Sequence, residues 1–311
     1  MDRTPSLPPR PQIDAAGRIP AGERALVLGG GGSTGNAWLI GVVAGLHAAG
    51  LDVTSADLTI GTSAGSTAAA QFAGASPADL FAATVAAVPP GRAGRPGSAG
   101  RVQAAADHID RMTATVAAAR DADDLRHRMC AAALDRPGSA DAELQARWRA
   151  TVAARLPRPD WPERAVLITA VDAERAEPVV FDRLSGVELA DAVAASCSSG
   201  FAYRIGDRRY VDGGYRRNAE NADLAAGYGR VLVLSPFGGR SFAPAEWGTD
   251  LAAQVDELRA QGSRVETVTP SPDAERLFGA NAMDLSLRPD AARAGFAQGE
   301  ALAGRLARFW A

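Results

Sequence analysis

The sequence contains no lysine, so all 33 of its basic side chains are arginines. Without lysine, the protein cannot form a Schiff base with a carbonyl substrate or with pyridoxal phosphate. The P-loop of nucleoside triphosphatases is excluded as well, because its Gly-Lys-Ser/Thr signature needs a lysine that reaches the phosphates. Composition alone therefore removes three large classes of enzyme.

Metal ligands and disulfide-forming residues are also scarce. The cysteines are Cys130 and Cys197, and the histidines are His47, His108 and His127. These residues are too few for a disulfide framework and too scattered for a metal cluster. The formal net charge of −3 gives no electrostatic reason to expect a nucleic acid. We therefore predict no metal, no cofactor and no nucleic-acid partner.

The N-terminal segment lacks the apolar core of a signal peptide, since residues 1–22 are rich in proline and charge. We expect this segment to form an arm outside the folded domain, and the protein to be cytoplasmic. Residues 25–51 contain no Asp, Glu or Arg and are long enough to cross a bilayer. Four consecutive glycines interrupt that stretch after a few apolar residues, which argues against a membrane span.

Strand-like and helix-like segments alternate along the rest of the chain. The strand-like runs are 25–28, 58–60, 165–171, 178–181, 209–211, 231–234 and 265–268; the helix-like runs are 36–50, 66–73, 76–88, 187–195, 247–261 and 289–310. This alternation predicts an α/β fold with a mostly parallel central sheet and helices on both faces. We place one domain at 23–311. Within it, residues 89–157 show no strand signal, and we interpret them as a helical insertion and a candidate lid that begins with a Pro- and Gly-rich linker at 89–100.

The strongest chemical signal is the sequence Gly61-Thr62-Ser63-Ala64-Gly65, which matches GxSxG. In this motif the serine occupies a sharp turn between a strand and a helix, and the flanking glycines avoid collisions there. An apolar triplet precedes the motif and a helix-like run follows it, as the turn requires. We therefore predict that Ser63 is a nucleophile, supported by Gly61 and Gly65.

A second glycine-rich stretch, 29–35, follows the first predicted strand. Its backbone N–H groups, at the start of a helix, are suited to binding a phosphate or a tetrahedral oxyanion. The candidate residues for an oxyanion hole are Gly30, Gly31, Gly32, Ser33 and Gly35. The same stretch satisfies GxGxxG, with Asp52 at a suitable spacing for a ribose contact, so a dinucleotide-binding oxidoreductase is an alternative. Against it, the strand after that spacing ends in the GxSxG turn instead of an acid.

A third signal, Asp212-Gly213-Gly214, ends an apolar run. Alone, such a tripeptide is usually a structural turn. A serine nucleophile needs a base, however, and triads of the α/β-hydrolase type place a histidine after the acid. The last histidine is His127, well before Asp212, so a carboxylate acting directly on Ser63 is the remaining route.

These three motifs, in this order, resemble the patatin-like phospholipase family over residues 24–235. The resemblance implies a Ser63–Asp212 dyad, an oxyanion hole built from Gly31 and Gly32 or their neighbours, and a supporting role for Asn218 shortly after Gly213-Gly214. It also implies hydrolysis of phospholipid, lysophospholipid or neutral lipid esters without a metal, with transient contact at a membrane surface.

The sequence departs from the family pattern at two places. Thr34 occupies the loop position where the family usually carries Arg or Lys, which puts the rate and the preference for a phosphate headgroup in question. Prolines usual before the DGG motif and after Asn218 are also absent, and Ala219 stands at the second position. A catalytically silent relative that binds lipid is therefore a further alternative.

Overall fold

The computed structural model describes residues 14–87, 112–241 and 243–311. Their strands form one eight-stranded sheet in the order β5-β6-β3-β2-β1-β7-β8, with β4 also paired to β3. The strands are β1 Arg24–Leu28, β2 Leu58–Gly61, β3 Ala165–Asp172, β4 Glu177–Phe181, β5 Tyr203–Ile205, β6 Arg208–Asp212, β7 Arg230–Leu234 and β8 Arg264–Val268. The pairs from β8 through β7, β1 and β2 to β3 are parallel, and β4, β5 and β6 add antiparallel pairs. The predicted mostly parallel sheet is confirmed.

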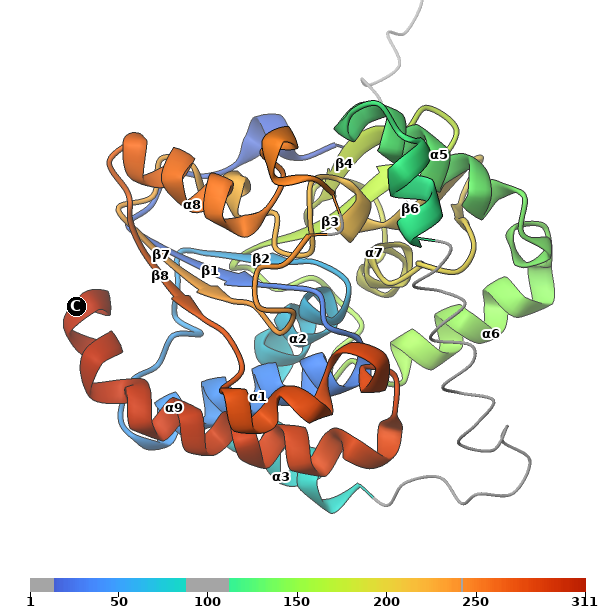
Figure 1. Ribbon diagram of the computed structural model, residues 1–311. Helices are drawn as coiled ribbons and strands as arrows, with labels where there is room; N and C mark the ends of the chain where they lie inside the picture. Colours follow the sequence, from blue (N-terminus) through green and yellow to red (C-terminus); the bar gives the residue numbers. More distant parts are fainter. Residues whose placement is uncertain (1–13, 88–111, 242) are drawn as a thin grey trace, which may run out of the picture.

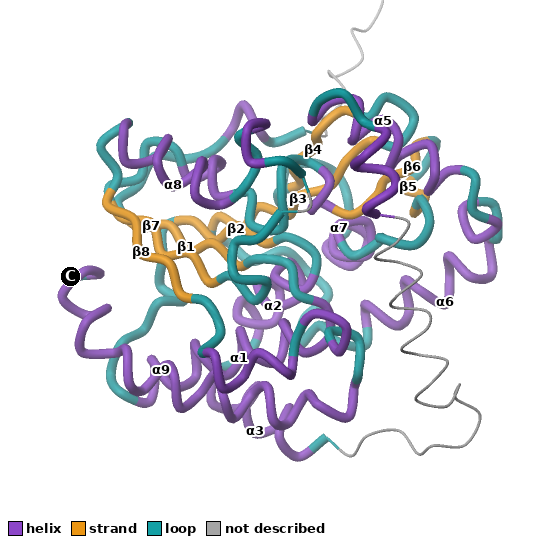
Figure 2. Tube along the Cα trace, in the orientation of Figure 1, coloured by secondary structure: helices purple, strands orange, loops and turns teal. Residues whose placement is uncertain are grey.

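Helices cover both faces of the sheet, as expected (Figures 1 and 2). On one face lie α1 Gly32–Ala48, α2 Ala64–Gly74, α3 Pro77–Ala86, α7 Leu189–Ser196 and α9 Arg288–Trp310. On the other lie α5 Ala122–Leu134, α8 Leu251–Ala260 and the short 3₁₀ helix η4 Ala222–Ala225. The helix α6 Ala142–Ala153 lies at the side of the molecule (Figure 1).

The period of two along each strand explains the division of the core. Leu26 and Leu28 of β1 belong to the apolar cluster beneath α1 and α9, whereas Ala25 and Val27 belong to the cluster beneath α8. Successive side chains of a strand point to opposite faces, so a strand buried on both faces must be apolar at every position. This is why β1 reads as a continuous apolar run in the sequence.

The long strand β3 positions the ends of two other strands against each other. Residues 168–172 of β3 pair with β4 along one edge, so the other edge is left to β2 at 165–168 and to β6 at 170–172. The strand β2 runs parallel to β3 and ends opposite Ile168, and β6 runs antiparallel and ends opposite Ala170. The carboxyl ends of β2 and β6 therefore point toward each other across a gap at Thr169.

Differences from the sequence-based elements are small and local. The helix expected from residue 36 begins at Gly32, because the last residues of the glycine loop already form its first turn. The strand β5 was not predicted, since Tyr203-Arg204-Ile205 is too short and too polar to stand out. In the expected insertion, α5 and α6 are helical, whereas the linker at 89–100 lies outside the described residues.

The described part of the N-terminal arm lies along β4. The backbone N–H of Ala15 donates to Val180 O over 2.7 Å, and Arg18 forms an ion pair with Asp182 at 2.9 Å. The stretch at 25–51 is divided between β1 and α1 instead of forming one apolar helix. Within the described ranges, no helix combines the length and the apolar character needed to cross a bilayer.

Candidate active site

Ser63 occupies a strained turn between β2 and α2. Its backbone has φ 51° and ψ −117°, a conformation that side-chain-bearing residues rarely adopt. The turn depends on glycine at both flanks: a Cβ on Gly65 would collide with the carbonyl oxygen of Leu28, and one on Gly61 would lie 2.7 Å from the Cα of Ser66. Strain of this kind is typical of functional sites, where the surrounding structure maintains it. The Ser63 side chain is partly exposed.

Asp212 lies at the end of β6, across the gap from this turn. Its side chain is buried, and its carboxylate accepts a hydrogen bond from the backbone N–H of Gly214 over 2.8 Å. The Ser63 hydroxyl lies near enough to this carboxylate to act on its pKa. Gly213 allows the chain to pass close to β3, because a Cβ there would collide with Thr169. The fold thus brings the two residues predicted as a dyad to neighbouring positions.

The surroundings of Asp212 raise its basicity. Burial raises its pKa from 3.8 to about 6, although the hydrogen bonds from Gly214 and Ser63 act in the opposite direction. A carboxyl with a pKa near 6 is ionised at neutral pH and is a stronger base than an exposed aspartate. Ionised Asp212 also acts on its neighbours: together with burial, its charge raises the pKa of the Cys197 thiol to about 11.

The C-terminal end of α7 holds the backbone of Ser63. The hydroxyl of Ser196 accepts a hydrogen bond from the Ser63 N–H over 2.9 Å, and the thiol of Cys197 donates to the Ser63 carbonyl oxygen over 3.1 Å. The N–H of Ser63 is thus engaged within the protein. These two contacts help to maintain the strained turn, and Cys197, with its raised pKa, serves as a neutral donor.

The glycine loop lies directly beside Ser63. A Cβ on Gly30 would lie 3.4 Å from the Cβ of Ser63, while a Cβ on Gly31 would lie 2.5 Å from Pro236. The N–H of Gly30 donates to Ala219 O over 2.8 Å, and the N–H of Gly35 donates to Gly31 O over 3.0 Å. Both groups are therefore already paired.

Three N–H groups of the loop have no acceptor among the described residues: those of Gly31, Gly32 and Ser33. These N–H groups lie at the start of α1, and the N-terminal end of a helix carries a partial positive charge. Of the five residues expected to supply oxyanion-hole donors, these three have an N–H group without an acceptor in the part of the chain that the structure describes. Thr34 leaves the loop itself uncharged, and its buried side chain is directed to the carbonyl oxygen of Ala282.

A buried asparagine that the sequence did not single out joins the motifs. The side-chain amide of Asn221 donates to the Thr62 hydroxyl over 3.0 Å and to Gly213 O over 2.9 Å. Asn218, which the resemblance did mark, accepts hydrogen bonds from the N–H groups of Glu220 and Asn221 and so shapes the turn that holds Asn221 in place. Asn221 itself has a left-handed backbone with φ 53°, which asparagine tolerates better than most residues.

The histidines do not approach this site where they are described. His47 and His127 are exposed, on α1 and α5 respectively, and His108 lies outside the described residues. The described ranges also contain no group of three or more His, Cys, Asp or Glu side chains that could hold a metal ion.

The position of Asp52 does not fit a dinucleotide site. Asp52 precedes β2 and is exposed, where it accepts a hydrogen bond from Thr54 N–H over 2.9 Å. Because β1 and β2 are parallel, the glycine loop lies at the carboxyl ends of these strands, whereas Asp52 lies at their amino ends. A dinucleotide site needs its ribose-binding acid at the same strand ends as the glycine loop. In this chain Ser63 follows β2 at that position.

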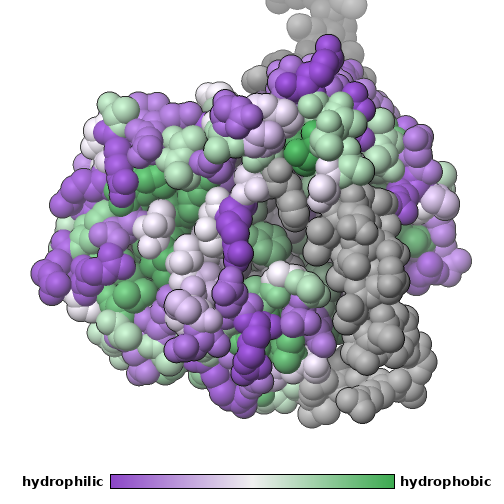
Figure 3. Space-filling view, viewed as in Figure 1, coloured by the Kyte–Doolittle hydropathy of each residue, from purple (hydrophilic) through white to green (hydrophobic). Residues whose placement is uncertain are grey.

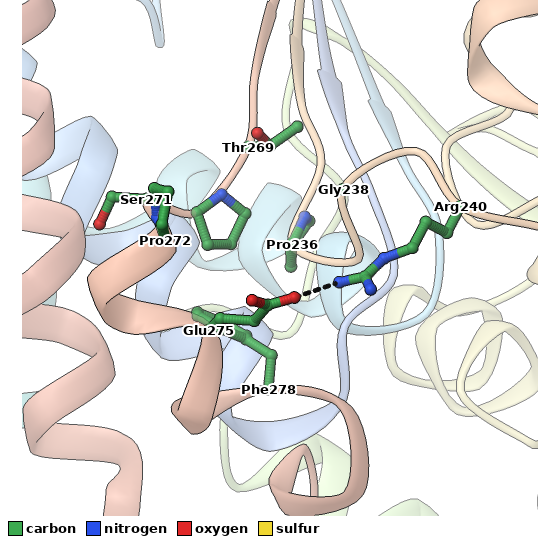
Figure 4. A pocket seen from close by; sticks show the side chains of 9 residues that line it. Pro236, Gly238, Arg240, Thr269, Ser271, Pro272, Glu275 and Phe278 are labelled. Atoms are coloured by element: carbon green, nitrogen blue, oxygen red, sulfur yellow. Dashed lines mark hydrogen bonds and ion pairs between the residues drawn. The ribbon is translucent and has the colours of Figure 1, made fainter.

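A separate pocket of about 270 Å³ lies behind the glycine loop, between the ends of β7 and β8 (Figure 4). Pro236 is shared by both features, since it lines the pocket and contacts the loop at Gly31. An ion pair between Arg240 and Glu275, 3.3 Å long, crosses this pocket (Figure 4). Neither Ser63 nor Asp212 lines this pocket, so it is not the opening through which a substrate would reach Ser63.

Comparisons with known proteins bear on this geometry. No curated protein matches the sequence. Among solved structures, the type III effector protein ExoU is 16% identical, with 90% of this chain and 54% of that chain covered and a TM-score of 0.34. A complex of full-length SpcU with full-length ExoU from Pseudomonas aeruginosa gives 18% identity, 91% and 53% coverage and a TM-score of 0.32. The chain thus spans about half the length of these proteins.

The family comparison is more extensive. The model described as "Patatin-like phospholipase" matches residues 26–225. That range includes the glycine loop, the turn at Ser63 and the Asp212-Gly213-Gly214 motif, and it covers more than half of the chain. The chain belongs to the patatin-like phospholipase family.

Proposed function

We propose that this protein is a serine acyl hydrolase that cleaves the ester bonds of phospholipids, lysophospholipids or related lipid esters. The observation that carries the proposal is the placement of Ser63, on its strained turn, beside the buried carboxylate of Asp212, where β2 and β6 end against β3. Family membership supports the same chemistry. In this proposal Ser63 is the nucleophile and Asp212 is the general base.

Acylation begins when Asp212 accepts the hydroxyl proton of Ser63, whose oxygen attacks the ester carbonyl carbon. The carbonyl oxygen becomes an oxyanion, which the free N–H groups at residues 31–33 stabilise by about 3 kcal/mol per donor. Protonated Asp212 then gives its proton to the leaving alcohol, and an acyl-serine remains. Deacylation repeats these steps with water: Asp212 accepts a proton from water, hydroxide attacks the acyl-serine, and Ser63 regains its proton as the fatty acid leaves.

A large apolar side chain is exposed beside the glycine loop. Met283 is 74% exposed, and its sulfur lies 3.0 Å from the position that a Cβ on Gly32 would occupy. Contiguous exposed apolar areas mark contact surfaces, whereas a single exposed apolar side chain is ordinary. On the coloured part of the face drawn in Figure 3, hydrophilic and hydrophobic residues are interspersed. Family membership is the ground on which we propose transient contact with lipid aggregates.

The test combines a serine-reactive probe with a short-chain ester. Wild-type protein is expected to be labelled by a fluorophosphonate at Ser63, and Ser63→Ala is expected to lose both labelling and hydrolysis of nitrophenyl butyrate. Ser199→Ala, which removes the hydroxyl of an exposed serine, serves as the matched control and should retain both. Labelling at another serine, or full activity of Ser63→Ala, would contradict the proposal. Lipid binding by a wild-type protein that resists the probe would instead identify a catalytically silent relative.

A further inference from the structure

The first residue of α9 brings a positive charge to the oxyanion loop. Arg288 donates through Nη1 to the Ser33 carbonyl oxygen over 2.7 Å and to the Ser33 hydroxyl over 3.3 Å. Through Nη2 it donates to the Asn36 side-chain oxygen over 3.0 Å. Close packing of α9 on α1 holds Arg288 at this position. The two helix backbones can approach closely because Gly41 and Gly295 place no side chain between them.

A second arginine, Arg155, is connected to Asn36 through its backbone. Its carbonyl oxygen accepts a hydrogen bond from Gln71 Nε2 over 3.2 Å, and Gln71 Oε1 accepts one from Asn36 Nδ2 over 3.0 Å. Asn36 in turn binds Arg288, so one hydrogen-bonded chain links both arginines. The positive charge of Arg155 acts to lower the pKa of Arg288. It has the same effect on the Cys197 thiol, whose pKa burial nevertheless raises overall. The guanidinium of Arg155 is therefore within electrostatic range of both groups.

Neither guanidinium is neutralised by the described residues. The ion pairs within the described ranges all use other arginines. The head of Arg155 is exposed and contacts the Trp148 ring at 5.9 Å, while Arg288 is partly buried. Burial, followed by the like charge of Arg155, lowers the pKa of Arg288 to about 10. The like charge of Arg155 acts against the charge of Arg288, and an anion bound by both arginines would offset that repulsion.

The position of this pair relates it to the reacting ester. Asn36 Nδ2 also donates to the carbonyl oxygen of Ala64 over 3.4 Å, one residue from the nucleophile. Cys197, within range of Arg155, donates to the carbonyl oxygen of Ser63. These contacts place the arginines near the turn that carries Ser63, so an anion bound by them would lie close to an ester at Ser63.

We propose that Arg155 and Arg288 form an anion subsite beside Ser63 that binds the phosphate group of a glycerophospholipid during hydrolysis. This inference rests on the proposed acyl hydrolase function and names the substrate class within it. In such a lipid, the acyl ester and the phosphate share one glycerol unit. Guanidinium groups bind phosphate oxygens through charge-assisted, often paired hydrogen bonds.

The experiment compares two soluble esters that differ only in the phosphate: dibutyrylglycerol phosphate and dibutyrylglycerol, both as monomers. Arg155→Gln should lower the ratio of kcat/KM on the phosphate ester to that on the neutral ester by about ten- to hundredfold, mainly through KM. Arg288→Gln should lower the same ratio, and Arg155→Lys should retain part of it. Arg264→Gln is the control. Arg264 is an exposed arginine at the start of the outermost strand β8, far from Ser63 in the strand order, and its replacement should keep the wild-type ratio.

The outcomes separate the inference from the proposed function. An equal loss on both esters in Arg155→Gln and Arg288→Gln would overturn the subsite and leave the hydrolase in place. Competitive inhibition by inorganic phosphate that Arg155→Gln weakens, together with an unmoved ratio, would assign the arginines to free phosphate and overturn the substrate class. If wild-type protein hydrolyses neither ester, the hydrolase fails. Calorimetric binding of dibutyrylglycerol phosphate to Ser63→Ala, with and without Arg155→Gln, then decides the subsite by itself.

Discussion

Ser63 and Asp212 lie at neighbouring positions because β2 and β6 end facing each other along one edge of β3. The two strands approach from opposite directions and stop opposite Ile168 and Ala170. The contact is therefore set by the rigid hydrogen-bond register of three strands, which holds the reacting atoms more firmly than flexible loops would.

The pH dependence of hydrolysis should report the titration of Asp212. Burial raises its pKa to about 6, and the base must be ionised to accept the Ser63 proton. We expect kcat/KM on a neutral ester to fall as pH decreases through about 6 and to level off above about 7. The measurement is initial rate from pH 4.5 to 8.5. A half-maximum near pH 4, the ordinary range of an exposed aspartate, would contradict this assignment.

Replacing the base should matter far more than replacing the histidines. Asp212→Asn should lower kcat by several orders of magnitude, because asparagine cannot accept the serine proton. Changing His47, His108 and His127 together to Gln should leave most of the activity, since His47 and His127 are exposed. Circular dichroism confirms that each variant is folded. An inactive, folded triple variant beside an active Asp212→Asn would show that a histidine supplies the base.

The same base should reduce stability at neutral pH. The folded protein holds the Asp212 proton more tightly than the unfolded chain, because the pKa is about 6 when folded and 3.8 in the ordinary state. Stability therefore falls as pH rises from about 4 to about 6, and the full loss is present above that range. At pH 7, Asp212→Asn should be more stable than wild type by about 3 kcal/mol, and by much less at pH 4.

Urea denaturation at both pH values measures this difference, and Asp182 provides a control of opposite sign. Burial would raise the pKa of Asp182, but hydrogen bonds from Arg18 and Ser185 outweigh it and hold the pKa below 3.8. Asp182→Asn should therefore destabilise the protein at pH 7. If Asp212→Asn is also destabilising at pH 7, the carboxylate is held by favourable interactions that outweigh its burial.

Gly65→Ala should destabilise the protein strongly, because the added methyl group would collide with the Leu28 carbonyl oxygen between β1 and α2. Relief requires these two elements to separate at the site of the nucleophile. We expect a loss of more than about 3 kcal/mol in unfolding free energy, with activity lost as well. Gly304→Ala in α9 is the matched control, since nothing lies within 4 Å of its Cβ position. That variant should be neutral or stabilised by up to about 1 kcal/mol. Equal stabilities for the two variants would show that the turn tolerates a side chain.

Local chemistry made much of this protein predictable. Apolar runs of strand length and the helix-like segments between them indicated the sheet, since burial on both faces demands apolar residues throughout. The glycines at 61 and 65 marked the turn because no other residue fits there. The absence of a histidine after Asp212 indicated a carboxylate base by inventory alone. Each of these signals lies within a few residues or in the composition.

Only the tertiary structure decided which distant groups complete the site. Asn221 looks like an ordinary loop residue until the fold places its amide against Thr62 and Gly213. Thr34 left the glycine loop without the expected charge, and Arg288, 255 residues from Ser33, brings a guanidinium to the same loop. Nothing near Arg288 in the sequence indicates this role, because it arises from the packing of α9 on α1. Sequence patterns record which side chains are buried or turned, whereas long-range contacts depend on how whole elements pack.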